Sequence, residues 1–274
     1  MLAVLDGLPW LKDQLEALCA QDCEEPWEVV VADNGSTDAT AEVVRHFSAR
    51  SSKVRLVDAS ARRGPAAARN TGARDAGGEL LAFCDADDVV RPGWLAALVA
   101  GLSGADVAAG VFDMASLNGR GPQEPRPAAT QQMGFLPAGL ASNLAVSRRA
   151  FEDAGGFSEE LQVGEDIDLC WRLQLAGCRF AVTQDAVVAK REHDDLRPIF
   201  SRAIAYGRSG PVLYRRYKSF GARRQLNGWV RSLGWLVVAV VRLGDRDVRR
   251  LWVRTAGMRL GRAFGSVKER VFFP

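Results

Sequence analysis

The chain has 274 residues, of which 47% are hydrophobic and 25% are charged. This composition is typical of a globular protein, and the length suffices for one large domain or one domain with an appendage. No apolar run reaches the roughly 18 residues of a membrane-spanning helix, and the first residues lack the order of a secretory signal. Five cysteines without Cys-x-x-Cys spacing predict neither a disulfide framework nor a zinc site.

The formal net charge of +3 conceals an asymmetry along the chain. Residues 1–190 carry 17 basic and 27 acidic side chains, a net charge of −10, whereas residues 191–274 carry 19 and 6, a net charge of +13. An acidic body repels a phosphorylated ligand unless a cation or local arginines intervene, and a basic tail is attracted to an anionic surface. We therefore expect the two parts to face different partners.

Helices and strands are predicted to alternate in the first part of the chain. Leucines at 8, 11, 15 and 18 have helical spacing, whereas Trp27–Ala32 is a short β-branched run. The expected order is helix 8–19, strand 27–32, helix from about 38, strand 54–57, helix 66–76, strand 79–84 and helix 92–102. Such alternation predicts an α/β fold with a parallel sheet covered by helices on both faces.

The second part of the chain is less regular. Residues 118–130 are rich in glycine and proline and predict a mobile loop. Two helices, 147–154 and 165–176, and two short strands, 180–182 and 186–188, are expected to follow, and the chain from about 197 onward is expected to be helical.

Carboxylates follow two of the predicted strands. Asp33 ends the first β-branched run, and Asp85, Asp87 and Asp88 follow the strand 79–84. Ligands of open parallel sheets bind beyond the carboxyl ends of the strands, and hard carboxylate oxygens suit Mg²⁺ or Mn²⁺. A single aspartate here is equally explained as a turn residue, but three carboxylates in four positions favour a divalent-metal site.

Three segments, VVVADNGSTDAT, AAARNTGARDAGGELLAFCDADD and GEDIDLCWRLQLAG, stand in an order and spacing that resemble glycosyltransferase family 2. The resemblance covers about residues 8–195. It implies a GT-A fold with a Rossmann-like, mostly parallel central sheet, and inverting transfer of a sugar from a nucleotide diphosphate sugar, most often a UDP-sugar, to an acceptor hydroxyl. The acceptor that the resemblance implies is a glycan, a lipid-linked group or a small molecule.

The resemblance also assigns roles to residues. It implies that Asp33 contacts the nucleobase or ribose, that Asp85 and Asp87 meet the ribose and the metal, and that Asp87 is a metal ligand. Arg69 matches a position near the nucleotide, although an exposed helix arginine paired with Asp75 explains it as well.

The third segment is expected to supply the catalytic base. Asp166 is implied as the group that deprotonates the acceptor hydroxyl, with its neighbour Glu165 as the alternative. His193, after the last short strand, matches a metal-binding histidine of many family members, or is a surface histidine among acidic residues. On the acceptor side, Ser142 or Asn143 faces the sugar, or belongs to an ordinary strand and turn.

The beginning of the chain departs from the family pattern. Only Leu2–Leu5 is available for the first strand, which in the family ends in a turn that holds the nucleobase. Either residues upstream complete the sheet, in which case an exposed strand edge and an incomplete nucleobase pocket are expected here, or these residues form a stub with Asp6 and Gly7 replacing the turn.

We expect residues 1–195 to form the catalytic domain, with about 1–115 on the donor side and about 116–195 on the acceptor side, followed by a basic, apolar helical extension, 196–274. Ser232–Leu243 is apolar but too short to span a bilayer, and arginines and tryptophans flank it. The extension suits either an anionic membrane surface or a helical cap on the domain or a second subunit, as in a homodimer. The protein is thus expected to be cytoplasmic, with peripheral binding to the inner membrane face, and no nucleic-acid partner is expected.

Two other functions compete with this interpretation. A non-catalytic nucleotide-sugar-binding or scaffold protein is suggested by the short first strand. A sugar nucleotidyltransferase requires an N-terminal glycine-rich loop with Arg and Lys, and the sequence has none.

Overall fold

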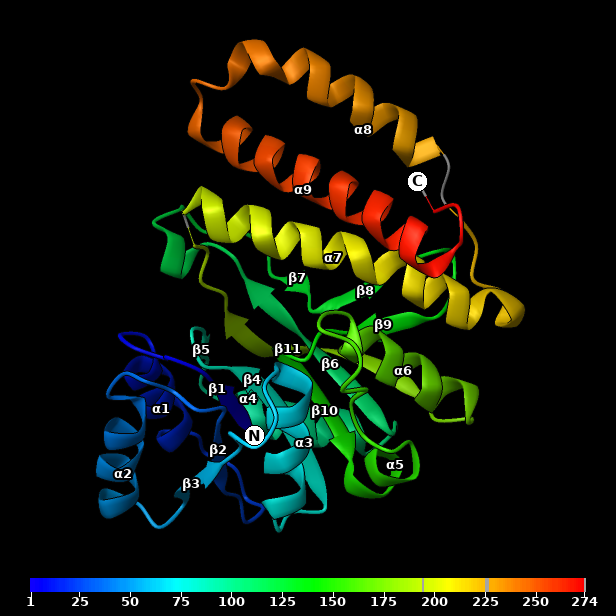
Figure 1. Ribbon diagram of the computed structural model, residues 1–274. Helices are drawn as coiled ribbons and strands as arrows, with labels where there is room; N and C mark the ends of the chain where they lie inside the picture. The colour runs from blue at the N-terminus through cyan, green and yellow to red at the C-terminus, as the bar shows by residue number, and fades with distance from the viewer. Residues whose placement is uncertain (194, 225–226, 274) are drawn as a thin grey trace. The chain divides into compact units, whose positions relative to one another are not determined.

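A computed structural model describes residues 1–193, 195–224 and 227–273 (Figure 1). They divide into two compact units. The first contains Met1–Thr130, Pro137–Glu160 and Glu165–Glu192. The second contains Gln131–Leu136, Leu161–Gly164 and the chain from His193 onward. The predicted functional division at residues 195 and 196 stays a prediction.

The first unit is a central sheet with helices. Its strands are β1 (Leu2–Val4), β2 (Val29–Asp33), β3 (Val54–Asp58), β4 (Leu80–Asp85), β5 (Val89–Val90), β6 (Val107–Asp113), β7 (Arg126–Pro127), β8 (Ala129–Gln131), β9 (Pro137–Gly139), β10 (Asn143–Ser147) and β11 (Phe180–Ala189). Its helices are α1 (Leu11–Cys19), α2 (Thr40–Arg50), α3 (Pro65–Asp75), α4 (Trp94–Leu102), the 3₁₀ turn η1 (Ser116–Asn118), α5 (Arg148–Asp153) and α6 (Glu165–Leu175). The predicted α/β class is confirmed.

The strand order of the main sheet is β3-β2-β1-β4-β10-β6-β11-β5, and β7 pairs with β6. The block from β3 to β4 is wholly parallel, as predicted. Beyond it, β10 runs antiparallel to both β4 and β6, so the sheet is mixed. Since β11 is parallel to β6, strands β2, β4 and β11 all point in one direction and end at the same edge of the sheet.

Two of the predicted elements differ in the structure. The predicted loop 118–130 contains β7 and the start of β8, because Arg126–Pro127 adds to β6 and β8 pairs with β9. The two short strands expected at 180–182 and 186–188 are one strand, β11, interrupted by a bulge between Val182 and Val187.

The short strand β1 lies inside the sheet. Leu2 pairs with Val31 of β2 on one side and with Cys84 of β4 on the other, so β1 is not an exposed edge. The backbone N–H of Asn34 donates to the carbonyl of Val4, which joins the ends of β1 and β2. A cavity of about 800 Å³ opens on the amino-terminal side of β1, between Val29–Val30 and Leu80–Ala82, and is also lined by Trp94. It therefore lies at the edge of the sheet opposite the carboxyl ends of β2 and β4.

The second unit consists of α7 (Leu196–Tyr217), the 3₁₀ turn η2 (Lys218–Phe220), α8 (Asn227–Val238), the 3₁₀ turn η3 (Ala239–Arg242) and α9 (Arg246–Glu269). Figure 1 shows α7, α8 and α9 as three long helices side by side. None of the described helices is both long enough and apolar enough to cross a membrane.

Helices α7 and α9 are in backbone contact along a line of glycines. Gly257, Gly261 and Gly265 of α9 recur every fourth residue and are buried. A methyl group on Gly261 would overlap the carbonyl oxygen of Ile204, and one on Gly207 of α7 would overlap that of Met258. This spacing holds the two helices closer together than any larger side chain permits.

We expect Gly261→Ala to destabilise the protein, although alanine is the better helix former. The gain in helix propensity is at most about 1 kcal/mol, and overpacking costs about 1–3 kcal/mol. Denaturant unfolding followed by circular dichroism measures the difference. The matched control is Gly234→Ala on α8, where an added methyl group meets no atom within 4 Å, so this variant should be neutral or stabilised. Equal stability of both variants would contradict the packing argument.

Candidate functional site

Three aspartates gather where β4 ends. Asp85 is the last residue of β4, and Asp87 and Asp88 lie in the turn before β5. The three residues can each offer a carboxylate oxygen within 4.8 Å of the others, an arrangement suited to a metal ion. The amide of Gln14, buried on α1, fixes the turn: its Nε2 donates to the Asp85 carbonyl at 2.8 Å, and its Oε1 accepts from the Val90 N–H at 2.9 Å. The three carboxylates that follow the strand in the sequence are thus close together in the structure, and their role as a metal site stays a prediction.

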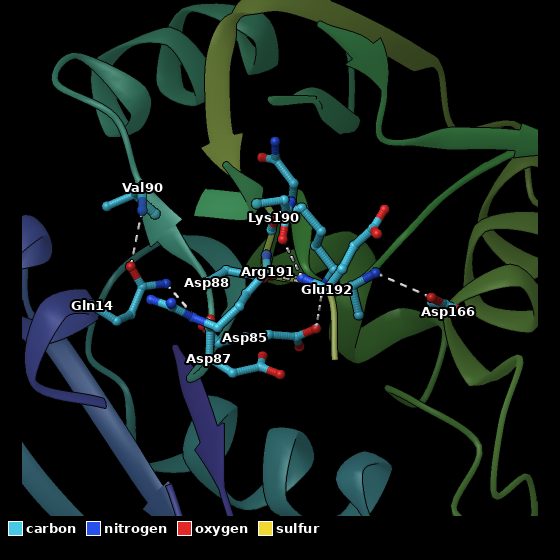
Figure 2. Close-up of polar contacts among 12 residues, drawn as sticks. Gln14, Asp85, Asp87, Asp88, Val90, Asp166, Lys190, Arg191 and Glu192 are labelled. Atoms are coloured by element: carbon cyan, nitrogen blue, oxygen red, sulfur yellow. Dashed lines mark hydrogen bonds and ion pairs between the residues drawn. The ribbon is translucent and has the colours of Figure 1, made fainter. Parts of the chain in front are cut away.

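Two cations hold these carboxylates. Lys190, which directly follows β11, places its Nζ 3.1 Å from Asp85 Oδ2 and 2.7 Å from Asp88 Oδ2. Arg69 of α3 donates from Nη2 to Asp85 Oδ1 at 3.1 Å. Figure 2 shows Lys190 and Arg191 beside the three aspartates, with Asp166 reaching in from a separate helix. The site is therefore a network of paired charges.

The protonation of the aspartates depends on these pairs. Burial raises the pKa of Asp85, but the charges of Lys190 and Arg69 outweigh it and lower the pKa to about 2. Asp88 is fully buried. Its burial and the neighbouring carboxylates outweigh Lys190 and raise its pKa to about 7. Burial lowers the pKa of Lys190, yet Asp85 and Asp88 raise it well above its ordinary value.

Arg191 contacts both the aspartate cluster and residues at the start of α1. Its backbone N–H donates to Asp88 Oδ1 at 3.0 Å, and its Nε donates to the Asp87 carbonyl at 3.0 Å. Its guanidinium lies over the ring of Trp10, 4.0 Å from the centroid, and 3.3 Å from Asp13. Arg191 thereby joins the end of β11 to the turn that carries Asp87.

The two candidate bases lie at the start of α6. Glu165 is buried, and its Oε1 accepts from Arg69 Nη1 at 2.7 Å. Asp166 is half-buried, and its Oδ2 accepts from the Ala141 N–H at 3.1 Å. Burial, together with Asp166, outweighs Arg69 and raises the pKa of Glu165 to about 7. Burial also raises the pKa of Asp166.

A single guanidinium therefore links the two predicted clusters. Arg69 bridges Glu165 and Asp85, which are 80 residues apart in sequence. Arg69 is buried, so the alternative interpretation of Arg69 as an exposed helix residue paired with Asp75 is wrong. Asp75 pairs with Arg55 instead. The structure brings Arg69, Asp85, Asp87, Glu165 and Asp166 into one region of the first unit.

Asp33 lies at the end of β2, and its carboxylate holds the loop after it. Oδ1 accepts from the N–H of Ser36 at 2.9 Å and from its hydroxyl at 2.6 Å. Ser36 Oγ in turn accepts from the Asp6 N–H at 2.9 Å, and Asp6 Oδ1 accepts from the Thr37 N–H at 2.7 Å. Asp6 is thus hydrogen-bonded to the DNGSTD loop. This is the residue that, with Gly7, the sequence suggested as a replacement for the longer turn of the family.

Two other residues that the sequence analysis named are His193 and Asn143. His193 belongs to the second unit, where its carbonyl accepts from Arg250 Nη2 at 3.2 Å. Its role as a metal ligand stays a prediction. Asn143 is fully buried: its Nδ2 donates to the carbonyls of Val111 and Ala186, and its Oδ1 accepts from Trp94 Nε1. Asn143 therefore ties β10 to β6, β11 and α4, and the ordinary-strand alternative is correct for it.

The sequence did not single out Lys190, Arg191 or Gln14. The position of Lys190 could have indicated a role in the site, because Lys190 directly follows β11, and the carboxyl ends of β11 and β4 lie at the same edge of the sheet. Its pairing with Asp85 spans 105 residues, which no local pattern reveals.

Comparison with known proteins shows which proteins this chain resembles. The family model "Glycosyl transferase family 2" matches residues 4–150. The pre-mycofactocin glycosyltransferase of Mycobacterium tuberculosis is 32% identical over 191 residues, which cover 65% of this chain and 40% of that protein. The chain thus spans less than half the length of that relative.

Solved structures of glycosyltransferases share the fold at low sequence identity, which confirms the predicted GT-A architecture with C-terminal helices. A mannosyltransferase from Pyrobaculum calidifontis, solved with GDP-Man and Mn²⁺, has a TM-score of 0.66 at 19% identity, covering 96% of this chain and 85% of that one. Residues 1–349 of TarS from S. aureus, solved with UDP-GlcNAc, have a TM-score of 0.55 at 18% identity, covering 100% and 92%.

Replacing Lys190 should destabilise the first unit. Lys190→Met leaves Asp85 and Asp88 close together without their shared cation, and breaking a buried pair costs about 3 kcal/mol. Urea unfolding near neutral pH measures the loss. The control is Arg149→Met, because Arg149 pairs with Asp153 on the surface and both side chains are exposed, so its loss should stay within about 0.5 kcal/mol. Similar losses in both variants would show that Lys190 is not required to hold the aspartates.

Proposed function

The chain belongs to glycosyl transferase family 2, and from this premise we propose that it transfers a sugar from a nucleotide diphosphate sugar to an acceptor hydroxyl, with inversion at the anomeric carbon. The observation that carries the proposal is the joint site: Asp85, Asp87 and Asp88 at the end of β4, linked through Arg69 to Glu165 and Asp166. One region thus contains carboxylates suited to a metal and carboxylates suited to proton transfer.

The chemistry of the cluster fits a divalent metal. Its donors are carboxylate oxygens, which Mg²⁺ and Mn²⁺ prefer, and the acidic first unit needs a cation if it is to bind a diphosphate. We propose Asp87 as the metal ligand, because its carboxylate belongs to the three-aspartate cluster and is less deeply buried than that of Asp88. His193 is proposed as a further ligand. A bound metal supplies positive charge to the diphosphate of the donor and to the leaving group.

In the proposed reaction the acceptor oxygen attacks the anomeric carbon from the face opposite the diphosphate. The new C–O bond forms as the bond to the diphosphate breaks, and the hydroxyl proton passes to Asp166. Asp166 suits this role better than Glu165, because it is half-buried whereas Glu165 is enclosed and paired with Arg69. Its raised pKa also makes it a stronger base than an ordinary aspartate.

The other residues hold the machinery in place. Glu165 and Arg69 act as positioning residues, because the guanidinium sets the distance between α6 and the end of β4. Asp33 is proposed to contact the nucleobase or ribose, with its carboxylate oriented by Ser36.

The donor is proposed to be a UDP-sugar. Structural neighbours were solved with UDP-GlcNAc and with GDP-Man, so a GDP-sugar is the alternative that experiment must separate. The acceptor is proposed to be a hydroxyl of a glycan, a lipid-linked group or a small molecule. A non-catalytic nucleotide-sugar binder has the same donor-binding properties, and only turnover distinguishes it from the proposed enzyme.

We expect one donor of a panel of UDP-, GDP- and dTDP-sugars to raise the melting temperature in Mn²⁺ and not in EDTA. Asp87→Ala should abolish that shift, because it removes the proposed metal ligand. The control is Asp153→Ala, since the Asp153 carboxylate is exposed on the surface and should leave the shift unchanged. A donor shift that survives both EDTA and Asp87→Ala would reject the metal site.

We expect Asp166→Asn to lower kcat by about 10²–10⁴-fold, because general base catalysis contributes that factor, with donor binding by calorimetry retained. As the pH is lowered, the base becomes protonated and kcat/KM of the wild type should fall. Because burial raises the pKa of Asp166, this fall should occur at a higher pH than it would for an ordinary aspartate.

Glu165→Gln separates the two candidates. If Glu165 only positions Arg69, this variant should keep the acidic limb of the pH profile and lose less activity than Asp166→Asn. An Asp166→Asn variant that keeps its activity beside an inactive Glu165→Gln would reverse the assignment.

A further inference from the structure

The second unit presents an apolar face that the proposed reaction does not use. On α8 and η3 the side chains of Val230, Leu233, Val237 and Val241 recur at helical spacing and are exposed, Val237 by 75% and Val241 by 87%. Val238 and Val240 beside them are exposed as well. We call these six side chains the valine face. Scattered apolar residues on a protein surface are ordinary, but a contiguous stripe indicates an interaction site.

The opposite side of α8 is already occupied by α9. Trp252 Nε1 of α9 donates to the Leu236 carbonyl at 2.8 Å, and Arg259 Nη2 donates to the Gly228 carbonyl at 3.0 Å. Ala239 of η3 is buried. Helix α9 therefore fixes the rotation of α8, and the valine face points away from the helix that supports it.

The charges around the valine face are of one sign. Arg231 is the one charged residue between Asn227 and Val241, and it is exposed. Over residues 227–254 as a whole, six arginines stand against two aspartates. One of the two, Asp245, accepts from the backbone N–H groups of Asp247 and Val248 at the start of α9. The apolar stripe is thus bordered by net positive charge, chiefly from Arg231, Arg242, Arg246 and Arg249.

Charge selects the partner of this face. In a symmetric dimer that pairs this face with itself, a second copy would bring the same arginines against these, and like charges across an interface oppose association. An anionic lipid surface has the complementary charge, and its interfacial region accepts apolar side chains while arginines reach the headgroups. Helix α8 and η3 together cover residues 227–242, too few for the roughly 20 residues of a spanning helix but enough to lie in the membrane plane.

We propose that the valine face lies in the interface of an anionic membrane, with Arg231, Arg242 and Arg246 at the level of the phosphate groups. This interaction is independent of sugar transfer and uses only residues of the second unit. It gives the basic part of the chain a partner of its own.

Sedimentation of the full chain with vesicles tests the proposal. We expect binding to vesicles of phosphatidylcholine with phosphatidylglycerol, little binding to phosphatidylcholine alone, and loss of binding as salt is raised. The double variant Val237→Asp, Val241→Asp should bind anionic vesicles more weakly by more than about tenfold, because two valine side chains that would be buried in the membrane interface are lost.

The single variant Val237→Asp should also bind more weakly, and its matched control is Val267→Asp, which introduces the same charge at an exposed valine of α9 outside the valine face. This control is the variant expected to be unaffected. It should bind as the wild type does, and circular dichroism should show all these variants folded. Equal binding of the double variant and the wild type would overturn the proposal, as would equal binding to neutral and anionic vesicles. A dimer in light scattering that the double variant abolishes, without vesicle binding, would instead assign the face to a second copy. Because no step requires turnover, failure here leaves the proposed reaction untouched.

Discussion

The ion-pair network of Arg69, Asp85, Lys190 and Asp88 is the interaction on which the site depends. Carboxylates at the end of a buried strand are stable only if cations or protons neutralise them, because burial penalises each uncompensated charge. Asp85 is neutralised by two cations, and its pKa falls to about 2. Asp88 is fully buried, and its burial and the neighbouring carboxylates outweigh Lys190, so its pKa rises to about 7. The two aspartates thus differ in protonation because Asp85 is paired with two cations, whereas Asp88 is more deeply buried.

The topology of the sheet makes that network possible. Inserting β10 antiparallel between β4 and β6 leaves β4 and β11 parallel, so Asp85 and Lys190 meet at one edge although no ladder joins their strands. Asn143 stabilises this insertion, because its side-chain amide bonds to the carbonyls of Val111 and Ala186 and to Trp94. A buried polar side chain that satisfies all its hydrogen bonds specifies one register. The polar residue that the sequence suggested for the sugar therefore supports the sheet.

Local patterns predicted most elements and the carboxylates at strand ends, because a β-branched run or a leucine repeat is encoded within a few residues. They did not predict the antiparallel β10, the pairing of Arg126–Pro127 with β6, or the role of Lys190. Each of these depends on partners tens of residues away, and a single lysine after a strand looks like any surface lysine. The three motifs of the family resemblance could be recognised, because each is a contiguous stretch of sequence.

Charge also explains why one chain combines an acidic and a basic part. At the proposed site the five carboxylates of Asp85, Asp87, Asp88, Glu165 and Asp166 outnumber the two cations that pair with them, Arg69 and Lys190, whereas the Arg191 guanidinium pairs with Asp13. If all were ionised, negative charge would be in excess. The raised pKa values of Asp88 and Glu165 allow protons to neutralise part of this excess, and a bound divalent cation would neutralise it as well. A diphosphate adds further negative charge, so its binding favours the cation over protons. The basic helices belong to the second unit, and the anion proposed for them is a lipid surface.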